Sequence, residues 1–273
     1  MKESCHLLLQ SESEHIPDSF PPYRYTKFNN WINCPVPNPT ARMRLFCLPF
    51  AGSGASIFRT WGRELPQMIE LCPIQLPGRE NRLGEPPYTD MESLAECLVR
   101  EMLPYVQIPF ALFGHSMGAL LAFELVRTLR RHHCPMPLVL FLSAHRAAHL
   151  PLRRKHLHGL ADPEFIQAVR SLGGTPEEVF KHDDLLKVML TALRADFTLC
   201  DLYKFIPETP INCPLILFAG LQDTEVSREE VEAWSEHTTQ TARLHIFPGD
   251  HFFLRSDRDL LLRVIASTLV LSG

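Results

Sequence analysis

The dominant pattern along the chain is an alternation of short apolar runs with amphipathic segments, which begins near Met43. Short apolar runs bounded by Gly, Pro or polar residues are typical of buried strands, whereas apolar positions three and four residues apart indicate helices. The predicted strands are 44–49, 69–76, 110–114, 138–144, 214–220 and 242–247. The predicted helices are 57–65, 90–103, 117–129, 184–205, 227–237 and 256–270.

This alternation predicts an α/β fold. Strands separated by helices need right-handed crossovers, which give a mainly parallel sheet flanked by helices. The alternation is interrupted at about 145–207, where helices are indicated but no strand. A helical insertion that follows a strand of a parallel sheet lies over the carboxyl ends of the strands, where ligands bind, so we predict a lid. The alternative is a helical subdomain with no gating role.

Helix-start signals and the N-terminal segment complete the outline. The predicted N-cap residues are Thr89 or Asp90, Asp162, Thr175, Ser227 and Ser256, with capping boxes at Thr175 and Ser227. Residues 1–42 contain six prolines among polar residues and show little periodicity. We therefore predict a partly disordered N-terminal extension at 1–42 and one domain at 43–273.

Composition excludes several classes of function. The chain has 273 residues, of which 45% are hydrophobic and 21% charged, and a formal charge of −4, so it lacks the excess of basic residues that nucleic acids require. It has no apolar stretch of the about 18 residues that span a membrane, and the apolar segment at 7–9 is too short for a secretory signal. The eight cysteines form no Cys-x-x-Cys pair, so neither a disulfide framework nor a zinc site is expected. We expect a soluble, cytoplasmic monomer.

The strongest chemical motif is the Gly-x-Ser-x-Gly sequence at 114–118, between a predicted strand and a predicted helix. This arrangement is typical of a nucleophile elbow, in which Ser116 occupies a strained turn and the two glycines leave room where strand and helix crowd together. The N-terminus of the helix favours a developing oxyanion. A serine hydroxyl is a poor nucleophile at neutral pH, so a histidine base and a carboxylate that orients it are required.

Candidates for these partners follow later strands, because the order Ser, acid, His is that of α/β-hydrolases. His251 is in the glycine-containing loop after the last predicted strand, and Asp223 is in the loop after the strand before it. Asp250 is adjacent to His251 and too close to bond its ring. The alternatives for the acid are Glu225, Asp196 and Asp201.

Two backbone N–H groups are expected to form the oxyanion hole. One belongs to Met117, directly after the nucleophile, and the other to Ala51 in the small-residue loop 50–56. The alternative for this loop is a dinucleotide or phosphate site, but the glycine patterns of both are incomplete. No cofactor and no metal are expected.

Five separated motifs resemble the type II thioesterases of nonribosomal peptide and polyketide synthesis. They are Leu-Pro-Phe-Ala-Gly at 48–52, Leu-Pro-Gly-Arg-Glu-Asn-Arg at 76–82, Phe-Gly-His-Ser-Met-Gly at 113–118, Arg-Ala-Asp at 194–196 and Gly-Asp-His-Phe-Phe at 249–253. The medium-chain thioesterase of animal fatty acid synthesis is similar. The resemblance extends from about Trp31 to the C-terminus.

The resemblance implies an α/β-hydrolase with a helical lid. It implies an enzyme that hydrolyses acyl groups from the phosphopantetheine thiol of acyl or peptidyl carrier proteins, for editing or release during synthesis. Ser116, Asp223 and His251 match the family triad. The chain departs from the family at Phe50, where many members have histidine, and at Ser53, which is often glycine; either change can alter the acyl pocket while the Ala51 N–H is kept.

Other interpretations remain open from the sequence. Arg79 and Arg82 could contact the pantetheine phosphate, but a loop held by an Arg–Glu pair is favoured because the sequence places no phosphate. The rival functions are a general carboxylesterase acting on small oxygen esters and a non-catalytic hydrolase-fold protein that binds a carrier or ligand. The complete triad argues against the second rival.

Overall fold

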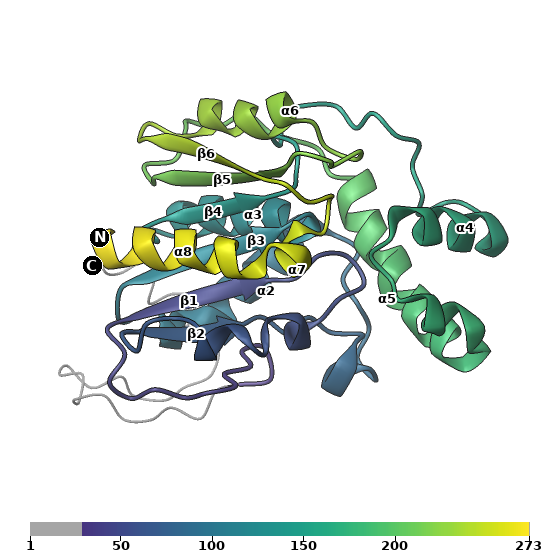
Figure 1. Ribbon diagram of the computed structural model, residues 1–273, viewed down its shortest axis with the longest axis horizontal. Coiled ribbons are helices and arrows are strands. Elements are labelled where there is room, and N and C mark those ends of the chain that lie inside the picture. Colours follow the sequence, from purple (N-terminus) through teal and green to yellow (C-terminus); the bar gives the residue numbers. More distant parts are fainter. Residues whose placement is uncertain (1–28, 273) are drawn as a thin grey trace.

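The computed structural model describes residues 29–272 and contains one sheet of six parallel strands (Figure 1). The strands are β1 (Met43–Leu48), β2 (Ile69–Pro73), β3 (Phe110–His115), β4 (Leu140–Ser143), β5 (Leu215–Gly220) and β6 (Ala242–Phe247). Their order in the sheet is β2-β1-β3-β4-β5-β6, and each neighbouring pair is parallel. Each predicted strand is present, so the predicted fold class is confirmed, although β2 and β4 are shorter than predicted.

Helices cover both faces of this sheet. They are α2 (Met91–Met102), α3 (Met117–Arg131), α4 (Asp162–Leu172), α5 (Asp183–Asp201), α6 (Arg228–Glu232), α7 (Phe253–Ser256) and α8 (Arg258–Ser272). Helices α2 and α3 pack on one face and α8 on the other (Figure 1). The predicted helix at 57–65 is instead two short 3-10 helices, Ala55–Phe58 and Trp61–Arg63, because Gly62 is a poor helix former and Pro66 ends the segment.

The central strands are buried on both faces, as expected for a parallel sheet between two helical layers. Successive side chains of a strand enter opposite cores. In β1, for example, Phe46 packs in the core of α2 and α3, whereas Leu45 packs in the core of α8. The edge strand β6 is only partly buried.

The helix starts were predicted with mixed success. Ser227 and Glu230 form the predicted capping box, and Asp90 caps α2 by accepting the Ser93 N–H. Three predicted caps are wrong. Asp162 lies inside the first turn of α4 with Ala161 at its N-cap, the 3-10 helix Glu177–Lys181 starts after Pro176 rather than at a capping Thr175, and Ser256 ends α7 instead of capping α8.

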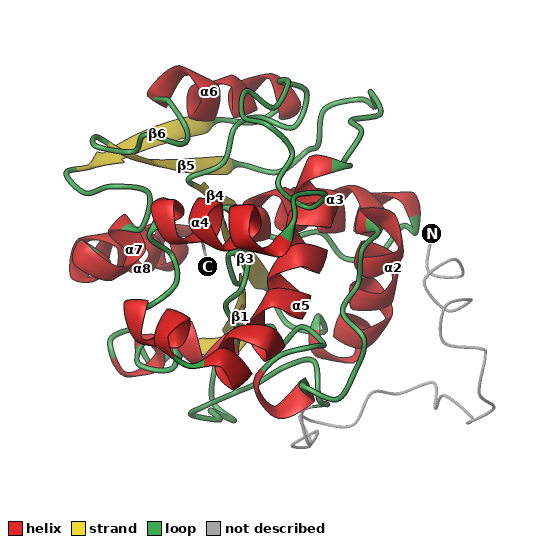
Figure 2. Ribbon diagram, turned by 90° about the vertical axis from the view of Figure 1, so that its right-hand side faces the viewer, coloured by secondary structure: helices red, strands yellow, loops and turns green. Residues whose placement is uncertain are grey.

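The helical segment between β4 and β5 lies where the lid was predicted. Figure 2 looks onto the carboxyl ends of the strands and shows α4 and α5 in front of them. The segment has its own small apolar cluster, which includes Phe165 of α4 and Phe197 of α5. The C-terminal half of α5 is buried and the N-terminal half is largely exposed, so the helix is anchored at one end. A gating role stays a prediction.

The chain packs against the sheet ahead of β1. Trp31 and Ile32 are buried, Ile32 forms an antiparallel bridge with Ile74, and the Gln75 N–H donates to the Trp31 carbonyl at 2.8 Å. Trp31 thus anchors part of the predicted extension to the domain. Residues 1–28 of that extension lie outside the described residues. In the part of the chain that the structure describes, no helix has the length and apolar character needed to cross a bilayer.

Candidate active site

Ser116 is the single residue between β3 and α3, as the elbow motif predicts. Its backbone has φ 52° and ψ −121°, a strained conformation for a residue with a Cβ, and its N–H donates to the Ser143 carbonyl at 2.8 Å. A Cβ at Gly114 would overlap the Gly118 backbone, and one at Gly118 would overlap the Leu48 carbonyl. The two glycines therefore let β3, α3 and β1 approach closely enough to form the turn.

His251 and Asp223 lie beside this serine. The His251 Nδ1 is 2.8 Å from the Asp223 Oδ2, and the His251 Nε2 is 3.1 Å from the Ser116 Oγ. Asp223 follows β5 and His251 follows β6, so two adjacent parallel strands bring them to the same edge of the sheet. The Asp223 side chain is 1% exposed, and its other oxygen accepts the N–H groups of Glu225 and Val226. The structure thus brings together three residues that the sequence placed in one site.

The alternative acids are occupied elsewhere. Asp196 forms a buried ion pair with Arg79, and Asp201 accepts the backbone N–H groups of Leu157 and His158. The Asp250 side chain accepts the Phe252 N–H, as expected if it cannot fold back onto the His251 ring. Glu225 is exposed and meets Asp223 only through its backbone N–H.

His115 supports the position of His251, a role that the sequence analysis missed. It is fully buried; its Nε2 is 2.9 Å from the His251 carbonyl oxygen and its Nδ1 is 2.8 Å from the Ser143 Oγ. Burial, with the nearby His251, lowers the pKa of His115 well below 6.5, so the ring is neutral. A neutral ring that donates from Nε2 to the carbonyl accepts the Ser143 hydroxyl at Nδ1. The available sequence signal was the position of His115 inside the elbow motif.

Buried neutral histidines predict a loss of stability in acid. Burial also lowers the pKa of His145, to about 3. Below pH 6.5, His115 and His145 become protonated in the unfolded chain but stay neutral in the folded protein. The free energy of unfolding should therefore fall by about 1.4 kcal/mol per pH unit for each histidine. Urea unfolding at pH 7 and pH 5 measures this. The same free energy at both values would contradict the prediction.

The two N–H groups expected to form the oxyanion hole are close to the serine. Met117 is the first residue of α3, and Ala51 and Met117 line one cavity together with Ser116 and His251. Among the hydrogen bonds formed within residues 29–272, neither of these N–H groups has an acceptor. The turn that carries Ala51 is closed by the Ser53 N–H and Oγ, both of which donate to the Phe50 carbonyl.

The loop at 77–82 is held in place by its arginines. Arg82 pairs with Glu85 and lies over the Trp31 ring, so the predicted Arg–Glu pair is present. Arg79 pairs instead with Asp196 of α5, 117 residues away in the sequence. Both arginines are buried.

The cavity beside Ser116 has a volume of about 470 Å³ and is lined in part by residues of α4 and α5. Much of its apolar lining comes from the helical segment between β4 and β5 and from two aromatic residues, Phe50 and Phe252, which pack edge to face. These lining residues are Phe50, Leu152, Val169, Leu172, Leu193, Phe197 and Phe252. Phe50, one of the departures from the family pattern, therefore shapes this cavity.

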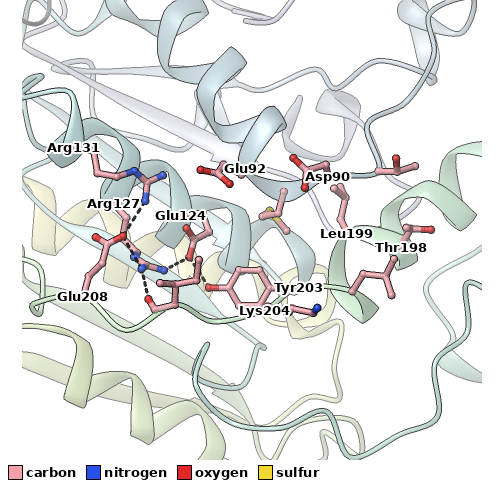
Figure 3. A pocket seen from close by; sticks show the side chains of 14 residues that line it. Asp90, Glu92, Glu124, Arg127, Arg131, Thr198, Leu199, Tyr203, Lys204 and Glu208 are labelled. Carbon is pink, nitrogen blue, oxygen red and sulfur yellow. Dashed lines mark hydrogen bonds and ion pairs between the residues drawn. The ribbon is translucent and has the colours of Figure 1, made fainter.

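A second cavity, of about 340 Å³, lies between α2, α3 and the segment after α5 (Figure 3). Its charged side chains largely satisfy one another: Arg127 pairs with Glu124 and Glu208, and the Tyr203 hydroxyl donates to Glu124 at 2.5 Å. It contains none of the proposed site residues. Within residues 29–272, no group of three or more His, Cys, Asp or Glu side chains is arranged to hold a metal ion.

Comparisons with known proteins agree with this geometry. The thioesterase domain family matches residues 43–269. The gramicidin S biosynthesis protein GrsT of Aneurinibacillus migulanus is 42% identical over 245 residues, which cover 89% of this chain and 95% of that protein. The medium-chain S-acyl fatty acid synthase thioesterase of Rattus norvegicus is 32% identical over 89% of this chain and 94% of its own length.

A solved structure extends the comparison. The type II thioesterase BorB from the borrelidin biosynthetic cluster has a TM-score of 0.79 and 34% identity, covering 89% of this chain and 97% of that one. The family match, residues 43–269, includes all six strands and the helical segment between β4 and β5. The chain belongs to the thioesterase family, has the α/β-hydrolase fold and is similar to type II thioesterases of biosynthetic clusters.

Proposed function

We propose that the protein hydrolyses acyl thioesters carried on the phosphopantetheine thiol of carrier proteins. The observation that carries this proposal is the hydrogen-bonded series Ser116, His251 and Asp223 at the edge of a 470 Å³ cavity. The carrier-bound substrate is supported by relatives named for gramicidin S biosynthesis and for fatty acid synthase. Removal of misprimed or stalled acyl groups is the cellular role that fits such a substrate.

In the proposed mechanism, His251 accepts the hydroxyl proton of Ser116 at Nε2 while the Ser116 oxygen attacks the thioester carbonyl. The tetrahedral oxyanion accepts hydrogen bonds from the backbone N–H groups of Ala51 and Met117, aided by the positive end of the α3 dipole. The C–S bond then breaks, and His251 returns its proton to the pantetheine sulfur. Water that loses a proton to His251 then attacks the carbonyl of the acyl-Ser116 ester. The bond between the acyl carbon and the Ser116 oxygen breaks, His251 returns the proton to that oxygen, and the free acid leaves.

Each partner has a distinct role in this cycle. Asp223 accepts the Nδ1–H of His251, which keeps the proton-accepting nitrogen directed at Ser116. A thiol with a pKa near 8.5 is a far better leaving group than an alcohol, so the first step needs less acid assistance with a thioester than with an ester. No metal or cofactor takes part in the proposed steps. The apolar side of the cavity is the proposed acyl site.

Rates on two substrates test the proposal. We expect kcat/KM for an acyl thioester on a carrier protein to exceed that for a p-nitrophenyl ester of the same acyl group by at least about tenfold, because contacts with the carrier and pantetheine add binding energy in the transition state. Stopped-assay quantification of both products gives the ratio. A strong preference for the simple ester would instead identify a carboxylesterase.

A fluorophosphonate probe separates catalysis from mere binding. The activated Ser116 should react with it, and denatured protein should not. A folded protein that resists labelling would favour the non-catalytic interpretation.

A further inference from the structure

Two of the motifs that resemble the thioesterase family have no role in the steps above, and the structure joins them. Arg79 belongs to the loop after β2, and Asp196 belongs to the Arg-Ala-Asp sequence of α5. The Arg79 Nη1 is 2.6 Å from the Asp196 Oδ2, and the Nη2 is 2.8 Å from the Oδ1. Arg79 is 7% exposed and Asp196 is 0% exposed, so this two-pronged ion pair is shielded from water.

The same pair binds the backbone of the loop that carries Ala51. The Gly52 N–H donates to the Asp196 Oδ2 at 2.7 Å, and the Arg79 Nη1 donates to the Ser53 carbonyl at 3.2 Å. Gly52 has φ +78°, which favours glycine, and Leu193 of α5 occupies the space where a Cβ would project. Helix α5 thus contacts the residue next to Ala51 through both a carboxylate and an apolar side chain.

The contacts of Gly52 with Asp196 and of Ser53 with Arg79 fix the turn to the rest of the protein, which the local hydrogen bonds of the turn do not. The bonds from Ser53 to the Phe50 carbonyl close the turn but leave its orientation toward Ser116 unset. The bond from Gly52 to Asp196 and the bond from Arg79 to Ser53 tie the turn to two distant elements. The Gly52 N–H and the Ser53 carbonyl, which flank the turn next to Ala51, are therefore bonded to residues far away in the sequence.

We propose that Arg79 and Asp196 are positioning residues that hold the Ala51 N–H toward the carbonyl oxygen of an acyl group bound at Ser116. The inference rests on the oxyanion hole of the proposed function. Asp196 supplies the acceptor for Gly52, and Arg79 neutralises a carboxylate that would otherwise oppose a developing oxyanion nearby. The C-terminal half of α5 then belongs to the catalytic framework, and only the rest of the lid segment is free to move.

A double variant separates positioning from stability. Replacing a buried ion pair with apolar residues of similar size is often neutral or stabilising, so Arg79→Met with Asp196→Leu should fold. The variant leaves the Gly52 N–H without its acceptor. We expect kcat to fall about 10- to 100-fold with KM within about twofold, since a misplaced group near the chemistry costs up to about 100-fold and a lost oxyanion donor costs more.

The matched control is a second buried pair, Arg44 and Glu70, which lies near the starts of β1 and β2, whereas Ala51 follows the end of β1; its Nε to Oε2 distance is 2.7 Å. Arg44→Met with Glu70→Leu should leave kcat within about twofold of the wild type. A trifluoromethyl ketone, which forms an oxyanion on the serine, should bind the Arg79/Asp196 variant more weakly by the same factor as the loss of kcat. An equal loss in both double variants would overturn the proposal, as would an unchanged kcat or unchanged ketone affinity in a folded Arg79/Asp196 variant.

A p-nitrophenyl ester is the substrate for these assays because it reports on the oxyanion hole without a carrier protein. Wild-type protein that cleaves the ester but no carrier thioester would refute the proposed substrate and leave this test intact. If the double variant does not fold, Asp196→Asn takes its place. The amide keeps the size of the side chain but loses its charge, so kcat should fall about tenfold at constant KM; unchanged kcat would again overturn the proposal.

Discussion

Replacement of Ser116 by alanine should lower kcat by at least about 10⁴-fold for both a carrier thioester and a small ester. The hydroxyl oxygen is the atom that forms the acyl-enzyme, and without it only a water molecule could attack the substrate carbonyl directly. The fold should be unaffected, because alanine has the same Cβ in the strained turn and keeps the backbone bond to the Ser143 carbonyl. Single-turnover assays with a radiolabelled acyl carrier protein provide the needed sensitivity.

The matched control for this variant is Ser267→Ala, which removes an exposed hydroxyl from α8, far from the cavity. The control should keep full activity and reactivity toward the fluorophosphonate probe, whereas Ser116→Ala should lose both. Thermal unfolding of all three proteins verifies the fold. Turnover retained by a folded Ser116→Ala protein would show that another group is the nucleophile.

Replacement of Asp223 by asparagine should lower kcat by about 10⁴-fold, with little effect on KM. The Glu225 and Val226 N–H groups bind the Oδ1 of Asp223, so an asparagine oxygen would remain there and its NH2 would face the His251 Nδ1. The His251 Nδ1 would then have to accept a hydrogen bond from the amide, so the ring proton would be on Nε2, facing Ser116. The histidine could no longer accept the serine proton.

The comparison that tests the Asp223 assignment is Glu225→Gln. Because the Glu225 side chain is exposed, its charge should matter little, and kcat should stay within about threefold of the wild type. Steady-state kinetics of both variants and the wild type, under identical conditions, measure the two effects. Reversed effects, with the larger loss in Glu225→Gln, would move the acid to position 225.

The sequence was sufficient wherever local sterics or periodicity decide the structure. Buried strands produce apolar runs, and the elbow needs small residues two positions either side of Ser116, so both were predictable. Asp223 and His251 followed from their places after successive strands. Failures occurred where tertiary contacts decide. Ser256, for example, is a good N-cap residue, but it is the last residue of α7, which forms because Phe253 and Leu254 are buried in the core beside α8.

The supporting contacts of the site were the least predictable. His115 reaches the His251 carbonyl, and Arg79 reaches Asp196, across 136 and 117 residues of sequence. No spacing rule applies to pairs that meet only after the sheet has formed. The motif that contains Arg79 and the motif that contains Asp196 were both visible in the sequence. The contact between these two residues depends on how α5 lies over the sheet.

Because α5 is anchored only at its C-terminal half, the residues proposed for chemistry and part of the acyl-cavity wall come from separate regions of the sequence. The residues proposed to perform chemistry come from four loops after β1, β3, β5 and β6, whereas four apolar residues of the cavity wall, Leu152, Val169, Leu172 and Leu193, come from one uninterrupted stretch, 150–193. Substitutions within 150–193 can therefore change which acyl chain fits without altering the residues proposed to perform chemistry. That stretch ends at Leu193, whose side chain both lines the cavity and packs against Gly52, the residue next to Ala51.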